Sequence, residues 1–170
     1  IGLVVDGQPV VGAVCKPLGM HLWHAAAGEG ALLEVPGEEP HQLSVSDVEE
    51  VSDMRLVVTR THRFALLEEM VKVLGISKER PLGSAGLKMG AISTPEADLY
   101  VHLSLGLKEW DTCAPQIILE EAGGRLTDCF GKALRYNQED VMRRHGVIAS
   151  NGHVHDRIVE MIAPLAEKAF

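Results

Sequence analysis

The chain has 170 residues, of which 46% are hydrophobic, so it can bury a core and is not expected to be disordered. Its 16 basic and 24 acidic residues give a formal net charge of -8, and no cluster of Lys and Arg stands out, which makes a nucleic-acid polymer a poor partner. A small phosphorylated substrate remains compatible with this charge, because bound divalent cations reverse the local sign of an acidic site.

The first third of the chain has the pattern of an antiparallel meander. Three β-prone runs are separated by short turns that contain glycine, and such turns bring strands back beside each other. The runs are residues 1–5, 10–15 and 22–27. Residues 35–53 carry Pro36, Pro40 and many acidic side chains, so we expect a surface loop there.

The rest of the chain alternates between strand and helix patterns. The expected strands are residues 56–59, 97–103, 125–127 and 147–150, and the expected helices are residues 64–74, 115–122 and 153–168. No internal repeat, linker or low-complexity tract is visible. The pattern predicts a layered α/β fold with a mixed, partly antiparallel sheet, and one unit over residues 1–170 without an internal boundary.

Cysteine use and hydropathy favour a cytoplasmic protein. Cys15, Cys113 and Cys129 are odd in number and show no C-x-x-C spacing, so neither a disulfide framework nor a structural zinc site is expected. There is no run of about 18 apolar residues and no secretory signal pattern, so we expect neither a membrane partner nor a signal peptide. The chain opens at Ile1 inside an apolar strand, which indicates a piece of a longer protein and an exposed edge that allows an oligomer.

Asp111 lies near a predicted helix start. Pro115 suits a first helical turn, and Gly123 with Gly124 supplies a left-handed stop, so free backbone N–H groups are expected near Asp111 and Thr112. Asp111 could cap this helix or hold a metal ion, and a Trp-Asp pair alone predicts a cap more often.

A longer string around Asp111 is more specific. W-D-T-x-A-P, followed by E-A-G-G-R-L-T-D, resembles the C-terminal signature of the inositol monophosphatase superfamily of metal-dependent phosphatases. The strings IGLVVDGQPVVGAV and HAAAGEGA are similar to the whole superfamily. VTRTH, GSAGLK and WDTCAP resemble its branch of 3'(2'),5'-bisphosphate nucleotidases, whose substrate is 3'-phosphoadenosine 5'-phosphate.

This resemblance implies site residues and a cofactor. Asp111 would be a catalytic magnesium (Mg²⁺) ligand, while Thr59, His62, Ser84 and Lys88 would line the nucleotide site. Hydroxyl and imidazole groups can hydrogen-bond phosphate or ribose oxygens, and a lysine adds positive charge. Each residue alone has an ordinary interpretation, such as a solvated surface lysine or a helix start, and their joint occurrence in the expected order favours the site.

One departure from the family pattern limits the prediction. The family has a further metal-binding glutamate and an Asp-Pro-Ile/Leu-Asp-Gly-Thr box, and neither occurs here. The only Asp-Gly pair, Asp6-Gly7, is followed by Gln8 and not by threonine. We therefore expect a magnesium-dependent phosphatase in the complete protein, with this chain supplying one metal ligand and the substrate wall and being nearly inactive alone. An inositol or other sugar phosphatase, and a non-catalytic binding module, are the alternatives.

Two secondary expectations concern aromatic and histidine side chains. Trp110 is expected to pack behind Asp111 and hold its turn in place. The pairs His21/His24 and His153/His155 lack a cysteine or carboxylate partner at a recognised zinc spacing, so they are expected to be exposed to solvent.

Overall fold

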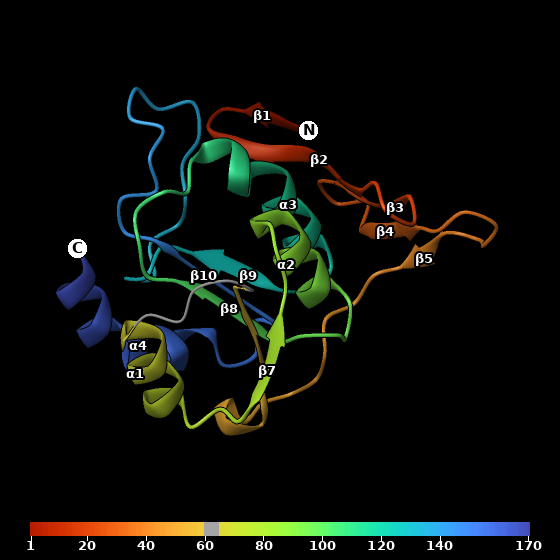
Figure 1. Ribbon diagram of the computed structural model, residues 1–170. Coiled ribbons are helices and arrows are strands. Elements are labelled where there is room, and N and C mark those ends of the chain that lie inside the picture. The colour runs from red at the N-terminus through yellow and green to blue at the C-terminus, as the bar shows by residue number, and fades with distance from the viewer. Residues whose placement is uncertain (60–64) are drawn as a thin grey trace.

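The computed structural model describes residues 1–59 and 65–170. In this part of the chain an antiparallel sheet, a pair of helices, a mixed sheet and a second pair of helices are stacked in that order (Figure 1). The predicted layered α/β fold with antiparallel strands is therefore confirmed.

The first sheet is a five-stranded antiparallel meander in chain order. Its strands are β1 (Gly2–Val5), β2 (Gln8–Lys16), β3 (His21–Ala26), β4 (Ala31–Glu34) and β5 (His41–Gln42). β4 and β5 were not predicted, and β5 lies inside the expected surface loop. β5 has only two residues, too few to give a strand pattern in the sequence. It is a strand because it pairs with Leu32 and Leu33 of β4. β1 lies at the edge with exposed apolar side chains, and pairing of this edge stays a prediction.

The second sheet is mixed, with the strand order β7-β6-β8-β10-β9. Its strands are β6 (Arg55–Val58), β7 (Lys78–Pro81), β8 (Leu99–His102), β9 (Arg125–Thr127) and β10 (Val147–Ser150), and a short 3-10 helix (Val51–Asp53) precedes β6. β6 runs parallel to β7 and β8, whereas β10 runs antiparallel to β8 and β9. β7 was not predicted because its sequence, Lys-Glu-Arg-Pro, has the charges and proline of an edge strand and not an apolar alternation.

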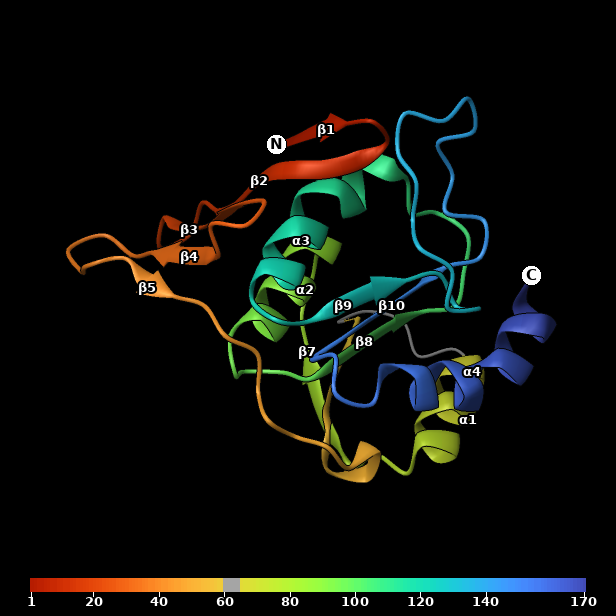
Figure 2. The same cartoon turned by 180° about the vertical axis from the view of Figure 1, so that it is seen from behind.

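Helices cover both faces of the mixed sheet (Figure 2). α1 (Ala65–Leu74) and α4 (His155–Ala169) pack on one face, and α2 (Ala85–Ser93) and α3 (Glu109–Glu121) lie between the two sheets. The strands alternate accordingly, because successive side chains point to opposite faces. In β8, Leu99 and Val101 pack with α1 and α4, whereas Tyr100 packs with α2 and α3.

Close contacts fix α3 against the antiparallel sheet. A Cβ atom on Gly12 of β2 would lie 2.5 Å from the Ala114 carbonyl oxygen, so this contact requires glycine. At the other end of the helix, the Glu121 carboxylate accepts hydrogen bonds of 2.8 Å from the backbone N–H groups of Gly28 and Gly30. The helix that carries Asp111 is therefore held at both ends.

The start of α3 corrects the prediction from Pro115. The helix begins at Glu109, so Pro115 lies in its interior and Asp111 in its first turn. The buried Glu109 carboxylate accepts hydrogen bonds from the backbone N–H groups of Asn137 and Gln138, and this tertiary contact secures an earlier start than proline alone suggests. The predicted left-handed stop is confirmed, since Gly123 has φ 94°.

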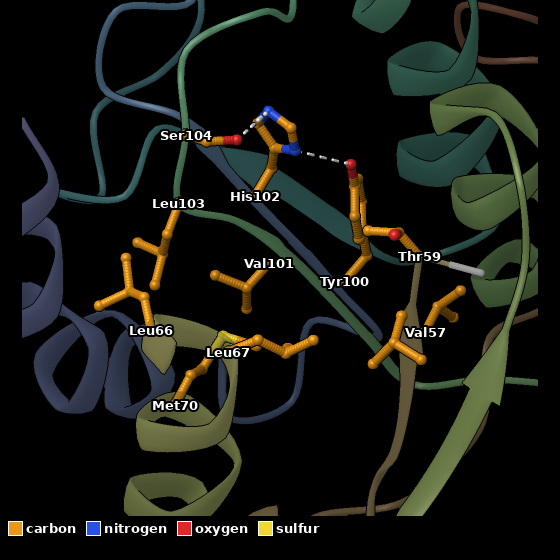
Figure 3. A pocket seen from close by; sticks show the side chains of 11 residues that line it. Val57, Thr59, Leu66, Leu67, Met70, Tyr100, Val101, His102, Leu103 and Ser104 are labelled. Atoms are coloured by element: carbon orange, nitrogen blue, oxygen red, sulfur yellow. Dashed lines mark hydrogen bonds between the residues drawn. The ribbon is translucent and has the colours of Figure 1, made fainter. Parts of the chain in front are cut away.

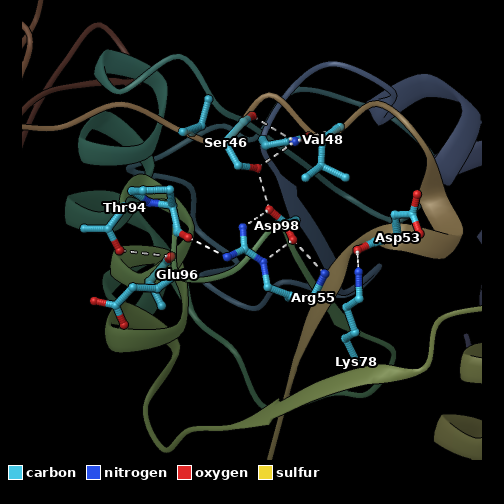
Figure 4. A network of polar contacts seen from close by, with 12 residues as sticks. Ser46, Val48, Asp53, Arg55, Lys78, Thr94, Glu96 and Asp98 are labelled. Atoms are coloured by element: carbon cyan, nitrogen blue, oxygen red, sulfur yellow. Dashed lines mark hydrogen bonds and ion pairs between the residues drawn. The ribbon is translucent and has the colours of Figure 1, made fainter.

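A polar network ties β6 to the start of β8 (Figure 4). The Asp98 carboxylate, which is 0% exposed, accepts hydrogen bonds from the backbone N–H and the guanidinium of Arg55 and from the Ser46 hydroxyl. The Asn151 amide donates to the Ser46 and Val48 carbonyl oxygens. The Asp98 carboxylate thereby joins the loop before β6 to β6 and the start of β8, and Asn151 adds the connection to α4 to this network.

His155 corrects the expectation that the histidine pairs are exposed. The side chain is 1% exposed, with Nδ1 2.8 Å from the Ser150 hydroxyl and Nε2 2.9 Å from the Thr127 hydroxyl. Burial, reinforced by the charge of Arg125, lowers the pKa of His155 from its ordinary value of 6.5 to about 4. The folded protein therefore keeps this imidazole neutral.

The buried His155 predicts a loss of stability at acid pH. The unfolded chain binds a proton here below about pH 6.5, whereas the folded protein does so only near pH 4, so the free energy of unfolding decreases as pH falls between these values. Between pH 7.5 and 4.5 this site should contribute a loss of about 2–3 kcal/mol. Urea unfolding at both pH values should show a smaller loss for His155→Gln than for wild type. His153→Gln, at an exposed position, should match wild type, and an unchanged pH dependence in His155→Gln would contradict the assignment.

Candidate active site

The predicted site residues that the structure describes lie at the ends of three elements and, for Lys88, within a helix. Thr59 follows β6, Ser84 precedes α2, and Asp111 lies in the first turn of α3, while Lys88 lies within α2. His62 lies outside the described residues. Asp111 and Ser84 line the same hollow of about 260 Å³.

Asp111 uses one carboxylate oxygen for the helix. Oδ2 accepts a hydrogen bond of 2.9 Å from the backbone N–H of Lys108, which is a capping contact. Oδ1 makes no hydrogen bond to any residue that the structure describes, and the side chain is half-buried beside the hollow. Capping and metal binding are therefore compatible, because each requires one oxygen.

The donor set fits one magnesium ligand and not a complete metal site. Within residues 1–59 and 65–170, no three or more His, Cys, Asp and Glu side chains are grouped closely enough to hold a metal ion. Magnesium prefers carboxylate oxygens and keeps several waters, and the free Asp111 oxygen has that chemistry. That the chain supplies one metal ligand stays a prediction.

Ser84 has a strained backbone beside Asp111. Its φ of 59° and ψ of 133° fall in a region that L-residues rarely adopt, and its hydroxyl makes no capping hydrogen bond to α2. The hydroxyl and the first backbone N–H groups of α2 therefore stay available to an anion. Strain of this kind is retained where the surroundings impose it, often at functional sites.

Replacing Ser84 with glycine should stabilise the fold and weaken the site. Relief of the positive φ is worth about 1–3 kcal/mol and the added chain entropy of glycine costs about 0.5–1 kcal/mol, so the net gain should be about 1 kcal/mol. Loss of the hydroxyl should raise KM for a phosphorylated substrate. Denaturant unfolding and steady-state kinetics of Ser84→Gly check both effects, and Ser84→Ala should raise KM without the gain in stability. Equal stability of the two variants would contradict the strain argument.

Lys88 is a buried cation. The side chain is 5% exposed, which excludes the interpretation as a solvated surface lysine. Its Nζ lies 4.5 Å from the centroid of the Tyr100 ring, and burial lowers the pKa of its ammonium group. Neither a hydrogen bond nor an ion pair joins this ammonium to another residue that the structure describes.

Tyr100, His102 and Ser104 form a polar rim that the sequence did not predict (Figure 3). Together with Thr59 they line a cavity of about 60 Å³, whose remaining walls are apolar side chains of α1, β6 and β8. Burial, followed by the charge of Lys88, lowers the pKa of His102 to about 4, while Asp111 opposes this effect. Burial and the Asp111 charge raise the pKa of Tyr100. The spacing i, i+2, i+4 at the end of a predicted strand was the signal that could have identified this group.

Trp110 does not pack behind Asp111 as expected. The indole is 65% exposed, and the Lys108 ammonium lies 5.0 Å from its ring centroid. Adjacent residues of a helix point in different directions, so the side chain next to Asp111 cannot support it from behind.

Comparison with known proteins identifies the family. Residues 1–168 match the sequence profile of the inositol monophosphatase family. The chain belongs to this family. It is 31% identical over 162 residues to the mouse protein named 3'(2'),5'-bisphosphate nucleotidase 1, with 88% of this chain and 49% of that protein covered. It is 32% identical over 165 residues to the histidinol-phosphatase of Mycobacterium tuberculosis, with 94% and 59% covered.

A solved structure of the family agrees with the observed fold. The inositol monophosphatase of Anabaena is 27% identical, covers 96% of this chain and is itself covered over 64%, with a TM-score of 0.75. The chain spans about half the length of the nucleotidases that it matches. No helix in the described residues is long and apolar enough to cross a membrane.

Proposed function

We propose that the complete protein is a magnesium-dependent phosphomonoester hydrolase that acts on 3'-phosphoadenosine 5'-phosphate. The observation that carries this proposal is the hollow shared by Asp111 and Ser84, where a carboxylate oxygen and a hydroxyl at a helix start make no hydrogen bond to the residues that the structure describes. The name of the mouse relative supports a bisphosphate nucleotide as substrate. The free cysteines Cys15, Cys113 and Cys129 are compatible with a cytoplasmic location.

The residues of this chain have distinct roles in the proposed reaction. Asp111 would hold magnesium, which when bound activates water and neutralises charge on the phosphate. Ser84 and the first backbone N–H groups of α2 would orient the phosphate oxygens, and Lys88 would add positive charge. Thr59, and by the sequence prediction His62, would bind the nucleotide. The sequence motifs assign this chain no metal ligand other than Asp111.

A sugar or amino-alcohol phosphate is the second candidate substrate. The identity to a histidinol-phosphatase extends over 94% of this chain, a larger share than for the mouse nucleotidase, and the same metal chemistry serves all phosphomonoesters. The non-catalytic binding module is the third alternative, because no three or more His, Cys, Asp and Glu side chains among the described residues are grouped closely enough to hold a metal ion.

Phosphate release by the full-length protein tests these alternatives. The substrates are 3'-phosphoadenosine 5'-phosphate, inositol 1-phosphate and histidinol phosphate, each measured with magnesium and with a chelator. We expect the highest kcat/KM for the nucleotide, and no phosphate release from any substrate in the presence of the chelator. A preference for either of the other substrates would replace the nucleotidase assignment, and no turnover of any would favour the binding module.

A further inference from the structure

A buried cation usually has an anionic partner, and Lys88 has none among the residues that the structure describes. Its ammonium group lies over the face of the Tyr100 ring, with 4.5 Å between Nζ and the ring centroid. The negative face of an aromatic ring attracts a cation, and this attraction is strongest where water is excluded. Tyr100 is 3% exposed, so its ring both stabilises Lys88 and limits the positions that the ammonium group can take.

The Tyr100 ring is itself held by a chain of hydrogen bonds. Its hydroxyl is 3.2 Å from Nδ1 of His102, and Nε2 of His102 is 3.1 Å from the Ser104 hydroxyl. Figure 3 shows the three side chains in a row along one side of β8 and the segment that follows. A neutral imidazole has one donor and one acceptor nitrogen, and both hydroxyl groups can donate or accept, so both tautomers of His102 satisfy the whole chain.

His102 lies in the fields of both proposed site charges. Burial, followed by the Lys88 ammonium, lowers the pKa of His102, and the Asp111 carboxylate raises it. The mechanism proposed above gives neither Tyr100 nor His102 a part. Their geometry nevertheless connects β8 to Lys88 on α2.

We propose that Tyr100 and His102 are positioning residues that hold the Lys88 ammonium group in place for a phosphate of the substrate. This inference rests on the proposed function, in which Lys88 binds that phosphate. Tyr100 acts through its ring face, and His102 acts by fixing the orientation of Tyr100. Affinity for the phosphorylated substrate then depends on residues that do not contact it.

A double-mutant cycle in the full-length protein separates positioning from general packing. Tyr100→Leu should raise KM roughly ten- to thirtyfold with kcat within about threefold, the pattern of lost binding without loss of chemistry. His102→Phe keeps the bulk and removes both hydrogen bonds, so KM should rise roughly two- to tenfold. In a Lys88→Met background, Tyr100→Leu should change KM less than about twofold, because the interaction is already lost. Multiplicative effects of the two substitutions would overturn the proposal.

An NMR measurement tests the same geometry without turnover. With ¹³C-labelled lysine and magnesium present, the Lys88 ε-methylene resonance should be shifted upfield by the Tyr100 ring, should move when inorganic phosphate is added, and should lose the ring shift in Tyr100→Leu. Phosphate should bind about tenfold more weakly to Tyr100→Leu and to Lys88→Met. Tyr136→Phe, at another buried tyrosine whose hydroxyl donates to Thr112 and Gln116, is the control and should leave the Lys88 resonance in place.

The kinetic and NMR measurements distinguish failure of the positioning role from failure of the proposed nucleotidase function. An unshifted Lys88 resonance in the wild-type protein, or phosphate affinity that is unchanged by Tyr100→Leu, would overturn the positioning role whatever the enzyme hydrolyses. Phosphate binding that depends on both residues, combined with no nucleotide turnover, would remove the nucleotidase assignment and leave Tyr100 and His102 as positioning residues for another phosphorylated ligand.

Discussion

Asp111→Asn is expected to lower magnesium-dependent phosphate release by the full-length protein at least about 100-fold. Substitutions in the outer shell of a metal site typically cost 10- to 100-fold, so loss of a charged ligand should cost at least the upper value. The amide oxygen of asparagine can still accept the hydrogen bond from the Lys108 backbone N–H, so α3 should keep its start. The measurement is kcat/KM as a function of magnesium concentration, with the unfolding midpoint determined on the same samples.

Asp156→Asn is the matched control for this substitution. Asp156 lies in the first turn of α4 with an exposed ion pair to Arg125, and it is remote from the hollow that Asp111 lines. Its amide variant should keep activity within about twofold, since exposed ion pairs contribute little. If Asp111→Asn retains wild-type activity and magnesium dependence, Asp111 is a helix cap and the metal site lies elsewhere.

Asp98→Ala should lower the free energy of unfolding by about 3 kcal/mol, near the lower end of the range for breaking a buried ion pair. Burial raises the pKa of this carboxyl, but hydrogen bonds from Arg55 and Ser46 outweigh it and hold the pKa below its ordinary value. Removing the carboxylate leaves four donor groups without their acceptor. The Arg55 side chain is 34% exposed, so water compensates part of the loss. Calorimetry should show a melting temperature about 6–12 °C lower.

Glu96→Ala provides the comparison for this prediction. Glu96 lies two residues before Asp98 and forms an ion pair with Arg80. Both side chains are exposed, so loss of this pair should lower the free energy of unfolding by less than about 1 kcal/mol. Equal destabilisation by the two substitutions would show that burial of the Asp98 carboxylate does not increase its contribution to the free energy of unfolding.

Much of the fold was predictable because buried strands and amphipathic helices leave periodic patterns. β1, β2, β3, β6, β8, β9, β10, α1 and α4 fall within a few residues of the predicted ranges. β5 and β7 were not, since a two-residue strand and a charged edge strand owe their conformation to neighbours far along the chain. The start of α3 was misplaced because proline is a local signal, whereas Glu109 is fixed by residues 137 and 138. The absence of an internal domain boundary stays a prediction.

The candidate site was predictable to a lesser degree. The motifs proposed Asp111 and Ser84, which share one hollow, and Lys88, whose burial no motif could reveal. Tyr100 and His102 were overlooked because a strand pattern assigns inward-facing aromatic residues to the core. Their relation to Lys88 depends on how α2 packs on the mixed sheet, a property of the assembled layers.

The contact between Gly12 and α3 also affects how the protein is made. The two segments that it joins, around Gly12 and Ala114, are separated by about 100 residues of chain, which a ribosome adds in about 5–20 s. During that interval β2 has been synthesised but its helix has not, so the face of the meander destined for α3 stays uncovered. Nascent chains paused between β3 and α3 should therefore bind chaperones. This binding should end when Glu121, the last residue of α3, emerges from the exit tunnel.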